Sequence, residues 1–194
     1  MRTQKMNCRL KTFPAFIKVG VALLLLPVFS LAQNTVTQTL SATVVPLGGL
    51  FLQSTPLVLT KGSASANSFS GTITLSYRAR TRQGTGQGTI TVEAKADFAP
   101  ALGPSIANPP SAGDTFTYSC SGATLGVSCS GIQNVSTTAA TTVVSIGASA
   151  CTGGGAPCSS TDPNSANITF NLMDDPTYKT GSYTATLIWT ISAS

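Results

Sequence analysis

Apolar and polar residues alternate near the end of the chain, between Asn164 and Ser194. A period of two places the apolar residues on one face of a β-strand and the polar residues on the other. Between two such sets lies DDPTYKTG, in which Pro176 removes a backbone donor and Gly181 permits a turn. The pattern therefore predicts a β-hairpin with a long turn and with Trp189 in the core. Its apolar positions are Ile168, Phe170 and Leu172, followed by Tyr183, Ala185, Leu187, Trp189 and Ile191.

The same alternation occurs on both sides of the sequence QGTGQG in the middle of the chain. It predicts a second hairpin, whose turn is centred on Thr85 and Gly86 and places Arg78 opposite Glu93. The apolar positions are Phe69, Ile73, Leu75, Tyr77 and Ala79 before the turn, and Ile90, Val92, Ala94, Ala96 and Phe98 after it.

Three arginines, Arg78, Arg80 and Arg82, recur at every second position on the polar face of this hairpin. At the rise of a strand they form a basic stripe about 13 Å long. One hypothesis is that the stripe contacts a polyanion, lipid A or the carboxylate of a glycan. The alternative is a solvated, partly charge-paired face that discourages edge-to-edge aggregation.

The segment from Asn34 to Val45 also alternates, with threonine and serine on one face. The pattern predicts a strand that ends at Pro46 and the glycine pair Gly48 and Gly49. Its apolar face carries Val36, Leu40, Ala42 and Val44.

About eight such strands are joined by turn-rich loops, the longest of which is the proline-rich segment 99–113. No internal repeat and no convincing amphipathic helix follow residue 32. These observations predict an all-β fold, namely an antiparallel immunoglobulin-like β-sandwich.

The beginning of the chain has the layout of a secretory signal peptide. Basic residues precede an apolar run, and the small residues Ser30 and Ala32 fit cleavage after Ala32. The run is shorter than the roughly 20 residues of a membrane-spanning helix. We therefore expect residues 1–32 to be cleaved and residues 33–194 to fold as one domain without a membrane span. That domain would be secreted into the periplasm or displayed at a bacterial cell surface.

Removal of the signal peptide changes the charge balance. Five of the eleven basic residues lie in it, so residues 33–194 hold six basic and six acidic residues. A segment without net charge gives no reason to expect nucleic acid or an anionic membrane as a partner.

Four cysteines follow residue 32, and an even number in an exported chain predicts disulfides. The preferred pairing joins Cys120 to Cys129 and Cys151 to Cys158, and each bridge closes a loop of roughly ten residues. A nested pairing, Cys120 to Cys158 with Cys129 to Cys151, is the alternative. Zinc is disfavoured as a ligand of these cysteines, because the chain has no histidine and the compartment is oxidising.

Residues suited to catalysis are scarce. Without histidine, neither a Ser-His-Asp nor a Cys-His arrangement can form. Glu93 and Asp97 lie about 13 Å apart along a strand, farther than the roughly 5 to 9.5 Å between glycosidase carboxylates. Oxygens of Asp162, Asn164, Asp174 and Asp175 suit calcium, although aspartates beside a proline are also typical of a turn. The sequence thus predicts a protein that is not an enzyme and uses no cofactor or metal.

The sequence GSYTATLIWTIS resembles the final strand of bacterial spore coat U-type and related pilin-like surface proteins, in which a Gly-x-Tyr turn precedes alternating threonine and apolar residues. Trp189, Thr190 and Ile191 also resemble the Trp-x-Leu motif in the C-terminal strand of WxL-type cell-wall domains. The chain differs from the WxL pattern by isoleucine at the third position. It differs from pilin-like endings by closing on Ile-Ser-Ala-Ser.

The pilin-like resemblance implies subunits that assemble by strand addition, in which the N-terminal strand of one chain completes the sheet of a neighbour. The inserted residues would be Val36, Leu40, Ala42 and Val44. The partners would be further copies of the chain or a surface-assembly chaperone. The same residues can instead form the first strand of a self-contained sandwich.

The leading hypothesis is therefore a non-enzymatic structural subunit of a pilus or fimbria. The alternative is a monomeric binding module or adhesin that recognises a glycan or another surface ligand. Such a module would use the arginine stripe or the proline-rich loop.

Overall fold

The computed structural model describes residues 38–52, 56–63, 67–151 and 161–194. The chain divides into two compact units, Met1–Ser41 and Ala42–Ser194, and all the described strands lie in the second. The expected signal peptide, residues 1–32, lies outside the described residues and stays a prediction.

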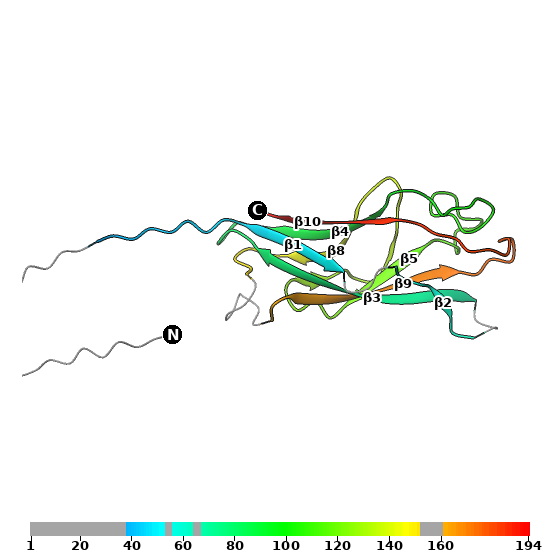
Figure 1. Cartoon of the computed structure of the whole chain (residues 1–194), viewed down its shortest axis with the longest axis horizontal. Coiled ribbons are helices and arrows are strands. Elements are labelled where there is room, and N and C mark those ends of the chain that lie inside the picture. The colour runs from blue at the N-terminus through cyan, green and yellow to red at the C-terminus, as the bar shows by residue number, and fades with distance from the viewer. Residues whose placement is uncertain (1–37, 53–55, 64–66, 152–160) are drawn as a thin grey trace, which may run out of the picture. The chain divides into compact units, whose positions relative to one another are not determined.

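The described residues of the second unit form ten β-strands and no helix (Figure 1). In chain order the strands are β1 (Leu47–Leu52), β2 (Thr60–Lys61), β3 (Ser68–Arg80), β4 (Gly88–Ala94), β5 (Thr117–Ser121), β6 (Val127–Ser128), β7 (Ile132–Asn134), β8 (Thr141–Ile146), β9 (Asn164–Met173) and β10 (Leu187–Ala193).

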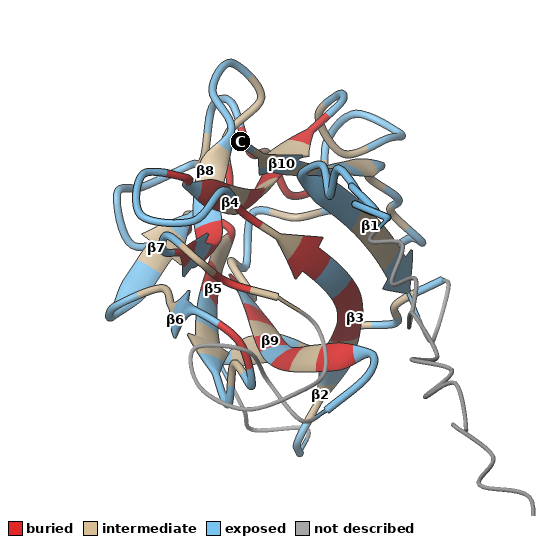
Figure 2. Ribbon diagram, turned by 90° about the vertical axis from the view of Figure 1, so that its left-hand side faces the viewer, coloured by how far each residue is buried: buried red, intermediate tan, exposed pale blue. Residues whose placement is uncertain are grey.

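The strands form two antiparallel sheets that enclose a common core (Figures 1 and 2). One sheet has the order β1-β3-β9-β5-β7, and the short β2 pairs with β3 beyond the end of β1. The other sheet has the order β10-β4-β8-β6. The predicted all-β antiparallel sandwich is confirmed.

Both predicted hairpins are wrong, because β3 and β4 lie in different sheets, and so do β9 and β10. Two consecutive strands in opposite sheets also turn their apolar faces toward each other across the core. The alternation of apolar residues is therefore the same for a hairpin and for a crossing between the sheets. Glu93 pairs with Ile188 of β10 and not with Arg78. The guanidinium of Arg78 instead lies 2.6 Å from a carboxylate oxygen of Asp162.

The core is formed by the inward side chains of the central strands. Phe170 has ring contacts with Phe116 and Tyr118, at centroid distances of 5.4 and 6.0 Å. Trp189 meets the same ring edge-on at 6.2 Å, which confirms its predicted place against the core. The fully buried aliphatic side chains are Leu75, Ile90, Ile168, Val92, Val143 and Val144.

Two buried polar side chains, those of Tyr77 and Asn164, form hydrogen bonds inside the sandwich. The hydroxyl of Tyr77 donates to the carbonyl of Leu125 and accepts from the N–H of the same residue. Burial raises the pKa of Tyr77, so its hydroxyl remains a donor over the physiological range. Nearby, the hydroxyl of Thr124 donates to the side-chain oxygen of Asn164. These bonds tie the loop after β5 to β3 and β9.

Residues 38–46 belong to no strand, so the strand expected from Asn34 to Val45 is absent from its described part. An alternating segment forms a strand only where a sheet edge accepts its backbone hydrogen bonds. The first strand, β1, instead covers the glycine pair that was expected to end a strand. A Cβ on Gly48 would lie 3.2 Å from two side-chain carbons of Ile191, so glycine permits the close approach of β1 to β10.

The disulfide between Cys120 and Cys129 is confirmed, and it joins β5 to the residue after β6. Its presence excludes the nested pairing. Cys151 is also disulfide-bonded. Cys158 lies outside the described residues, so the pairing of Cys151 with Cys158 stays a prediction.

Candidate functional site

β10 is the edge strand of its sheet, because it pairs with β4 and no described strand pairs with its other side. The N–H of Lys95 donates to the carbonyl of Thr186, one position before β10. In an antiparallel ladder, residues that bond to the partner alternate with residues whose N–H and C=O point away from it. The register therefore turns the backbone groups of Leu187, Trp189 and Ile191 away from β4. β1 approaches β10 at Ile191, so the open part of this side lies along Leu187 and Trp189.

The side chains of these three residues face the core but are only half-buried. On the neighbouring strand β4, by contrast, Ile90 and Val92 both have an exposed fraction of 0%. Both strands belong to one sheet, so the difference arises from what lies over them. The inward side chains of β4 are fully shielded from solvent, whereas those of β10 are only partly shielded.

The first sheet is interrupted on the same side of the sandwich. β1 pairs with β3 as far as Leu75, and β2 pairs with β3 only at Phe69 and Ser70. Between these pairings the chain passes β3 without forming a described strand. It passes closely, because a Cβ on Gly71 would lie 2.9 Å from the carbonyl oxygen of Val58. Glycine is thus required at this point of β3.

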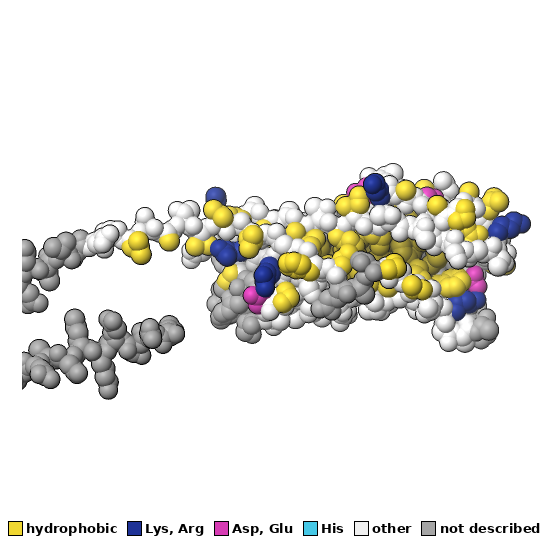
Figure 3. All heavy atoms as spheres, viewed as in Figure 1, with side chains coloured by type: hydrophobic (Ala, Val, Ile, Leu, Met, Phe, Trp, Pro, Cys, Tyr) yellow, Lys and Arg dark blue, Asp and Glu magenta, His cyan; other side chains and the backbone are white. Residues whose placement is uncertain are grey.

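Figure 3 shows hydrophobic side chains in a hollow on one face of the domain. In the same view, Figure 1 places β10 on one side of this hollow and the strands β2 and β3 on the other. We call β10 and this hollow the open edge. One side of it offers free main-chain donors and acceptors, and its floor is apolar, which is the chemistry that accepts an added β-strand. The half-buried hydrophobic residues on β1, on β3, on β10 and on the segments that lead into β2 and β10 are Leu50, Leu57, Leu59, Phe69, Ala185, Leu187, Trp189 and Ile191.

The opposite edge of the sandwich is built differently. There the edge strands β6 and β7 have two and three residues, and the disulfide from Cys120 to Cys129 closes the turn beside them. Short edge strands protect a sheet from unwanted pairing. β10 has seven residues, LIWTISA, with no charge and no proline to block pairing. The sequence therefore shows that nothing in β10 blocks pairing, although it does not show that β10 lies at an edge.

The predicted inserted residues are not part of the described sandwich strands. Leu40, Ala42 and Val44 are exposed, with exposed fractions of 91% for Leu40 and 69% for Val44. Val36 lies outside the described residues. The apolar face predicted for this segment is therefore available to a partner.

The three arginines lie at one end of the sandwich. Arg80 pairs in register with Leu47 at the start of β1, and the N–H of Arg82 donates to the carbonyl of Ser194. Arg78 forms its ion pair with Asp162, whereas Arg80 and Arg82 have no ion pair with any described residue. The expected pairing with Glu93 is thus replaced, but the basic character of this end remains.

The candidate calcium ligands are not brought together. Asp162 and Asn164 lie at the start of β9, and Asp174 and Asp175 follow its end, ten residues farther along. Asp174 accepts a bond from Lys61 at 2.5 Å. Within the described ranges, no group of three or more histidine, cysteine or acidic residues is placed to hold a metal ion. The predicted turn after β9 is supported, because the Thr177 N–H donates to the Asp175 carboxylate.

Carboxylates instead order the loops at the other end of the sandwich. Burial alone would raise the pKa of Asp97, but hydrogen bonds from Ser105, Ile106 and Phe98 outweigh it and hold that pKa below its usual value. Hydrogen bonds from Thr177 likewise lower the pKa of Asp175. These groups fix the proline-rich loop and the turn before β10.

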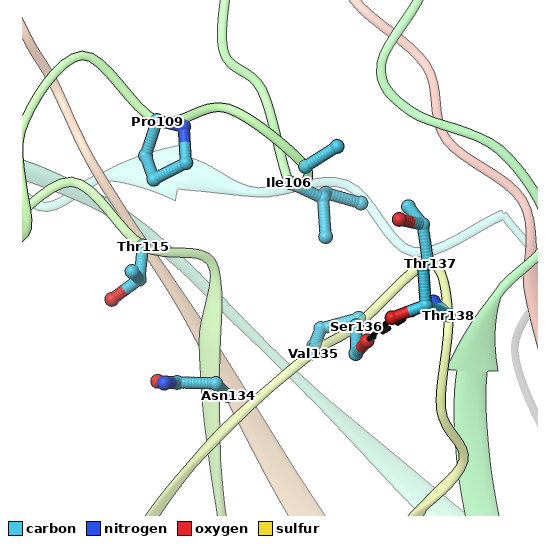
Figure 4. A pocket seen from close by; sticks show the side chains of 9 residues that line it. Ile106, Pro109, Thr115, Asn134, Val135, Ser136, Thr137 and Thr138 are labelled. Atoms are coloured by element: carbon cyan, nitrogen blue, oxygen red, sulfur yellow. Dashed lines mark hydrogen bonds between the residues drawn. The ribbon is translucent and has the colours of Figure 1, made fainter.

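A cavity of about 360 Å³ lies between the proline-rich loop and the segment after β7 (Figure 4). Its walls carry hydroxyl groups, and those of Ser136 and Thr138 lie 3.2 Å apart. No charged or aromatic side chain lines it, so it has neither a catalytic group nor a stacking surface for a sugar. The sequence predicted the loop, but it predicted a strand over residues 135–146, of which only β8 forms one, and did not indicate that residues 134–138 face the loop. The open edge is the stronger candidate site.

None of the described residues forms a helix with the length and apolar character needed to cross a membrane. Comparison of the chain with models of protein families and with curated protein sequences found no match.

Proposed function

We propose that this protein is a structural subunit of a bacterial surface polymer, in which residues 33–45 of one copy insert as a strand into the open edge of another. The observation that supports this most directly is the half-burial of Trp189 on a strand whose outer backbone groups have no described partner. One inserted strand would bond to these groups and cover the side chains beneath them. No catalytic group or cofactor is needed for such a role.

The N-terminal segment has the chemistry that the open edge requires. Its apolar residues Leu40, Ala42 and Val44 are exposed, and they would share one face if the segment formed a strand. Burying a leucine or valine side chain contributes about 1.5 to 3 kcal/mol. Each main-chain hydrogen bond adds about 0.5 to 1.5 kcal/mol. The main chain would supply affinity, and the alternating side chains would supply the register.

The positions of Leu47 and Ser194 favour insertion into a neighbouring copy. Leu47 at the start of β1 and Ser194 after β10 both lie beside the end of β3. If the segment runs antiparallel to β10 of the next copy, it leaves that copy at the end where β10 begins. Its own domain then lies beyond that end. Insertion into its own domain would need a reversal at Pro46 and a parallel pair with β10, which is the less stable arrangement.

Under this proposal, a free subunit must be protected from unwanted strand pairing before it assembles. A seven-residue edge without charge or proline is prone to pair with any extended chain. A surface-assembly chaperone in the periplasm would cover the open edge until another copy replaces it. The polymer itself would stand at the cell surface.

Purified residues 33–194 test the proposal. We expect a ladder of oligomers on a native gel and a molar mass that grows with concentration in light scattering. Leu40→Arg places a charge on the inserted face and should leave monomers, whereas Thr39→Arg, on the opposite face, should still assemble. A wild-type protein that stays monomeric at millimolar concentration would refute the proposal and favour the monomeric binding module.

A further inference from the structure

We propose that Arg80 and Arg82 dock each copy onto the acidic end of the next, which gives the polymer a second contact besides the inserted strand. This inference rests on the proposed strand insertion. It concerns a different surface, and the partner is a second copy of this chain.

The basic side of the contact surrounds the point where the N-terminal segment joins the domain. Arg80 is the register partner of Leu47, the first residue of β1. Arg82 is exposed, and its N–H bonds to the Ser194 carbonyl. Neither guanidinium forms an ion pair with the described residues, while Arg78 is already matched by Asp162. Two positive charges are therefore left over at this end.

The acidic side lies at the opposite end of the sandwich. Ser68 at the start of β3 pairs with Met173 at the end of β9, and Asp174 follows directly. Asp114, Asp174 and Asp175 lie close enough together that, after burial, their charges raise the pKa of Tyr178. The 13 residues of β3 separate the two ends by about 40 Å at the rise of a strand.

The charges of the domain are distributed unevenly along this axis. All twelve charged residues after residue 32 lie in the described part of the chain. The basic end holds three arginines and one aspartate, Asp162. The rest of the domain holds five acidic residues against three lysines, of which Lys61 is paired with Asp174. Counting side chains alone, the basic end thus carries two net positive charges, and the remainder carries two net negative charges.

Chain length brings the two ends together. The last apolar residue of the inserted segment, Val44, is separated from Leu47 only by Val45 and Pro46. Three residue steps span at most about 11 Å. A segment antiparallel to β10 leaves the open edge at the acidic end, because β10 runs toward Ser194 at the basic end. The basic end of one copy must therefore lie close to the acidic end of the next.

The experiment separates this contact from strand insertion. A synthetic peptide of residues 33–45 has no domain attached, so its affinity for a chain of residues 46–194 measures insertion alone. Arg80→Gln with Arg82→Gln in that chain should leave the peptide affinity unchanged. The same pair of substitutions in residues 33–194 should raise the concentration at which half the protein polymerises about fivefold at low salt. The two substitutions should also remove most of the effect of salt on polymerisation. A rise in salt concentration from about 50 to 500 mM should weaken polymerisation of the variant much less than that of the wild type.

Charge reversal gives a test that misfolding cannot imitate. Arg80→Glu with Arg82→Glu, and separately Asp175→Lys, should each polymerise poorly alone. An equimolar mixture should recover, because each reversed end then meets a matching end. Equal polymerisation of the wild type and the glutamine variant at every salt concentration, or no recovery on mixing, would overturn this inference. Failure of the peptide to bind would overturn strand insertion instead.

Discussion

Replacement of Leu40 with alanine is the sharpest test of strand insertion, because its neighbour Thr39 provides a matched control. Leu40 has an exposed fraction of 91%, so its loss removes no packing from the folded domain. In an inserted strand Leu40 would face the hollow of the open edge, and Thr39 would face the other side. Both substitutions shorten a neighbouring side chain to a methyl group, and they change opposite faces of the inserted strand.

The magnitude follows from the surface that insertion buries. Leu40→Ala removes three carbon groups, and at about 0.8 kcal/mol each this costs roughly 2 kcal/mol of binding free energy. Because 1.4 kcal/mol corresponds to a tenfold change, the affinity should fall roughly 30-fold. Thr39→Ala removes no buried group and should change the affinity by about twofold or less.

Trp189 supplies the assay. It is the only tryptophan of the chain, and it lies half-buried on the open edge. The peptide of residues 33–45 contains neither tryptophan nor tyrosine, so the fluorescence of a mixture with residues 46–194 reports on Trp189. Insertion should shift its emission to shorter wavelength as the indole loses contact with water. Titration with the wild-type, Leu40→Ala and Thr39→Ala peptides gives the three affinities.

Two results would refute the reasoning. If both substituted peptides bind as tightly as the wild type, the apolar face of the segment is not buried. If the emission of Trp189 stays unchanged at saturating peptide, the segment binds elsewhere on the domain.

Three further predictions concern the domain itself. Replacing Cys120 and Cys129 together with serine should lower the free energy of unfolding by about 2.5 kcal/mol, measured by urea denaturation, and an unchanged midpoint would contradict the role given to the bond. Tyr77→Phe leaves the buried carbonyl of Leu125 without its donor and should cost about 1 to 3 kcal/mol in the same assay, whereas Tyr183→Phe, whose hydroxyl bonds an exposed loop, should cost less. The pKa of Asp97 is lowered by folding, so its contribution to stability is present above its unfolded pKa of about 3.9 and is lost as pH falls through the lower folded value. Asp97→Asn should flatten thermal stability against pH in that acidic range, and a profile parallel to the wild type would count against the bonds to Ser105 and Ile106.

The alternation of apolar and polar residues predicted the positions of most strands but not the strands with which they pair. Ile168 and Phe170 are buried in β9, and Leu187 and Ile191 face inward from β10, as their spacing predicts. The error lay in pairing these segments with each other. Alternation is a local property, whereas the sheet that a strand joins depends on the path of the intervening loop. The same error misplaced Glu93 relative to the arginines.

The open edge could not be predicted from the sequence for a related reason. Its two sides come from β10 and from the segments around β2, which are more than a hundred residues apart in the chain. The strand predicted for the N-terminal segment is absent from its described part, although two of its apolar residues, Leu40 and Val44, are exposed. What the residues do not encode locally is that no described strand lies beside Trp189 on its outer side.

The N-terminal segment and β10 belong to one chain, so under the proposed assembly every copy brings one donor and one acceptor. A filament of any length then keeps an unused donor at one end and a vacant acceptor at the other, and it has polarity. Copies that begin at residue 46 can join only the donor end, where they stop growth. They should therefore act as chain terminators, and their mole fraction should set the mean length of the filaments.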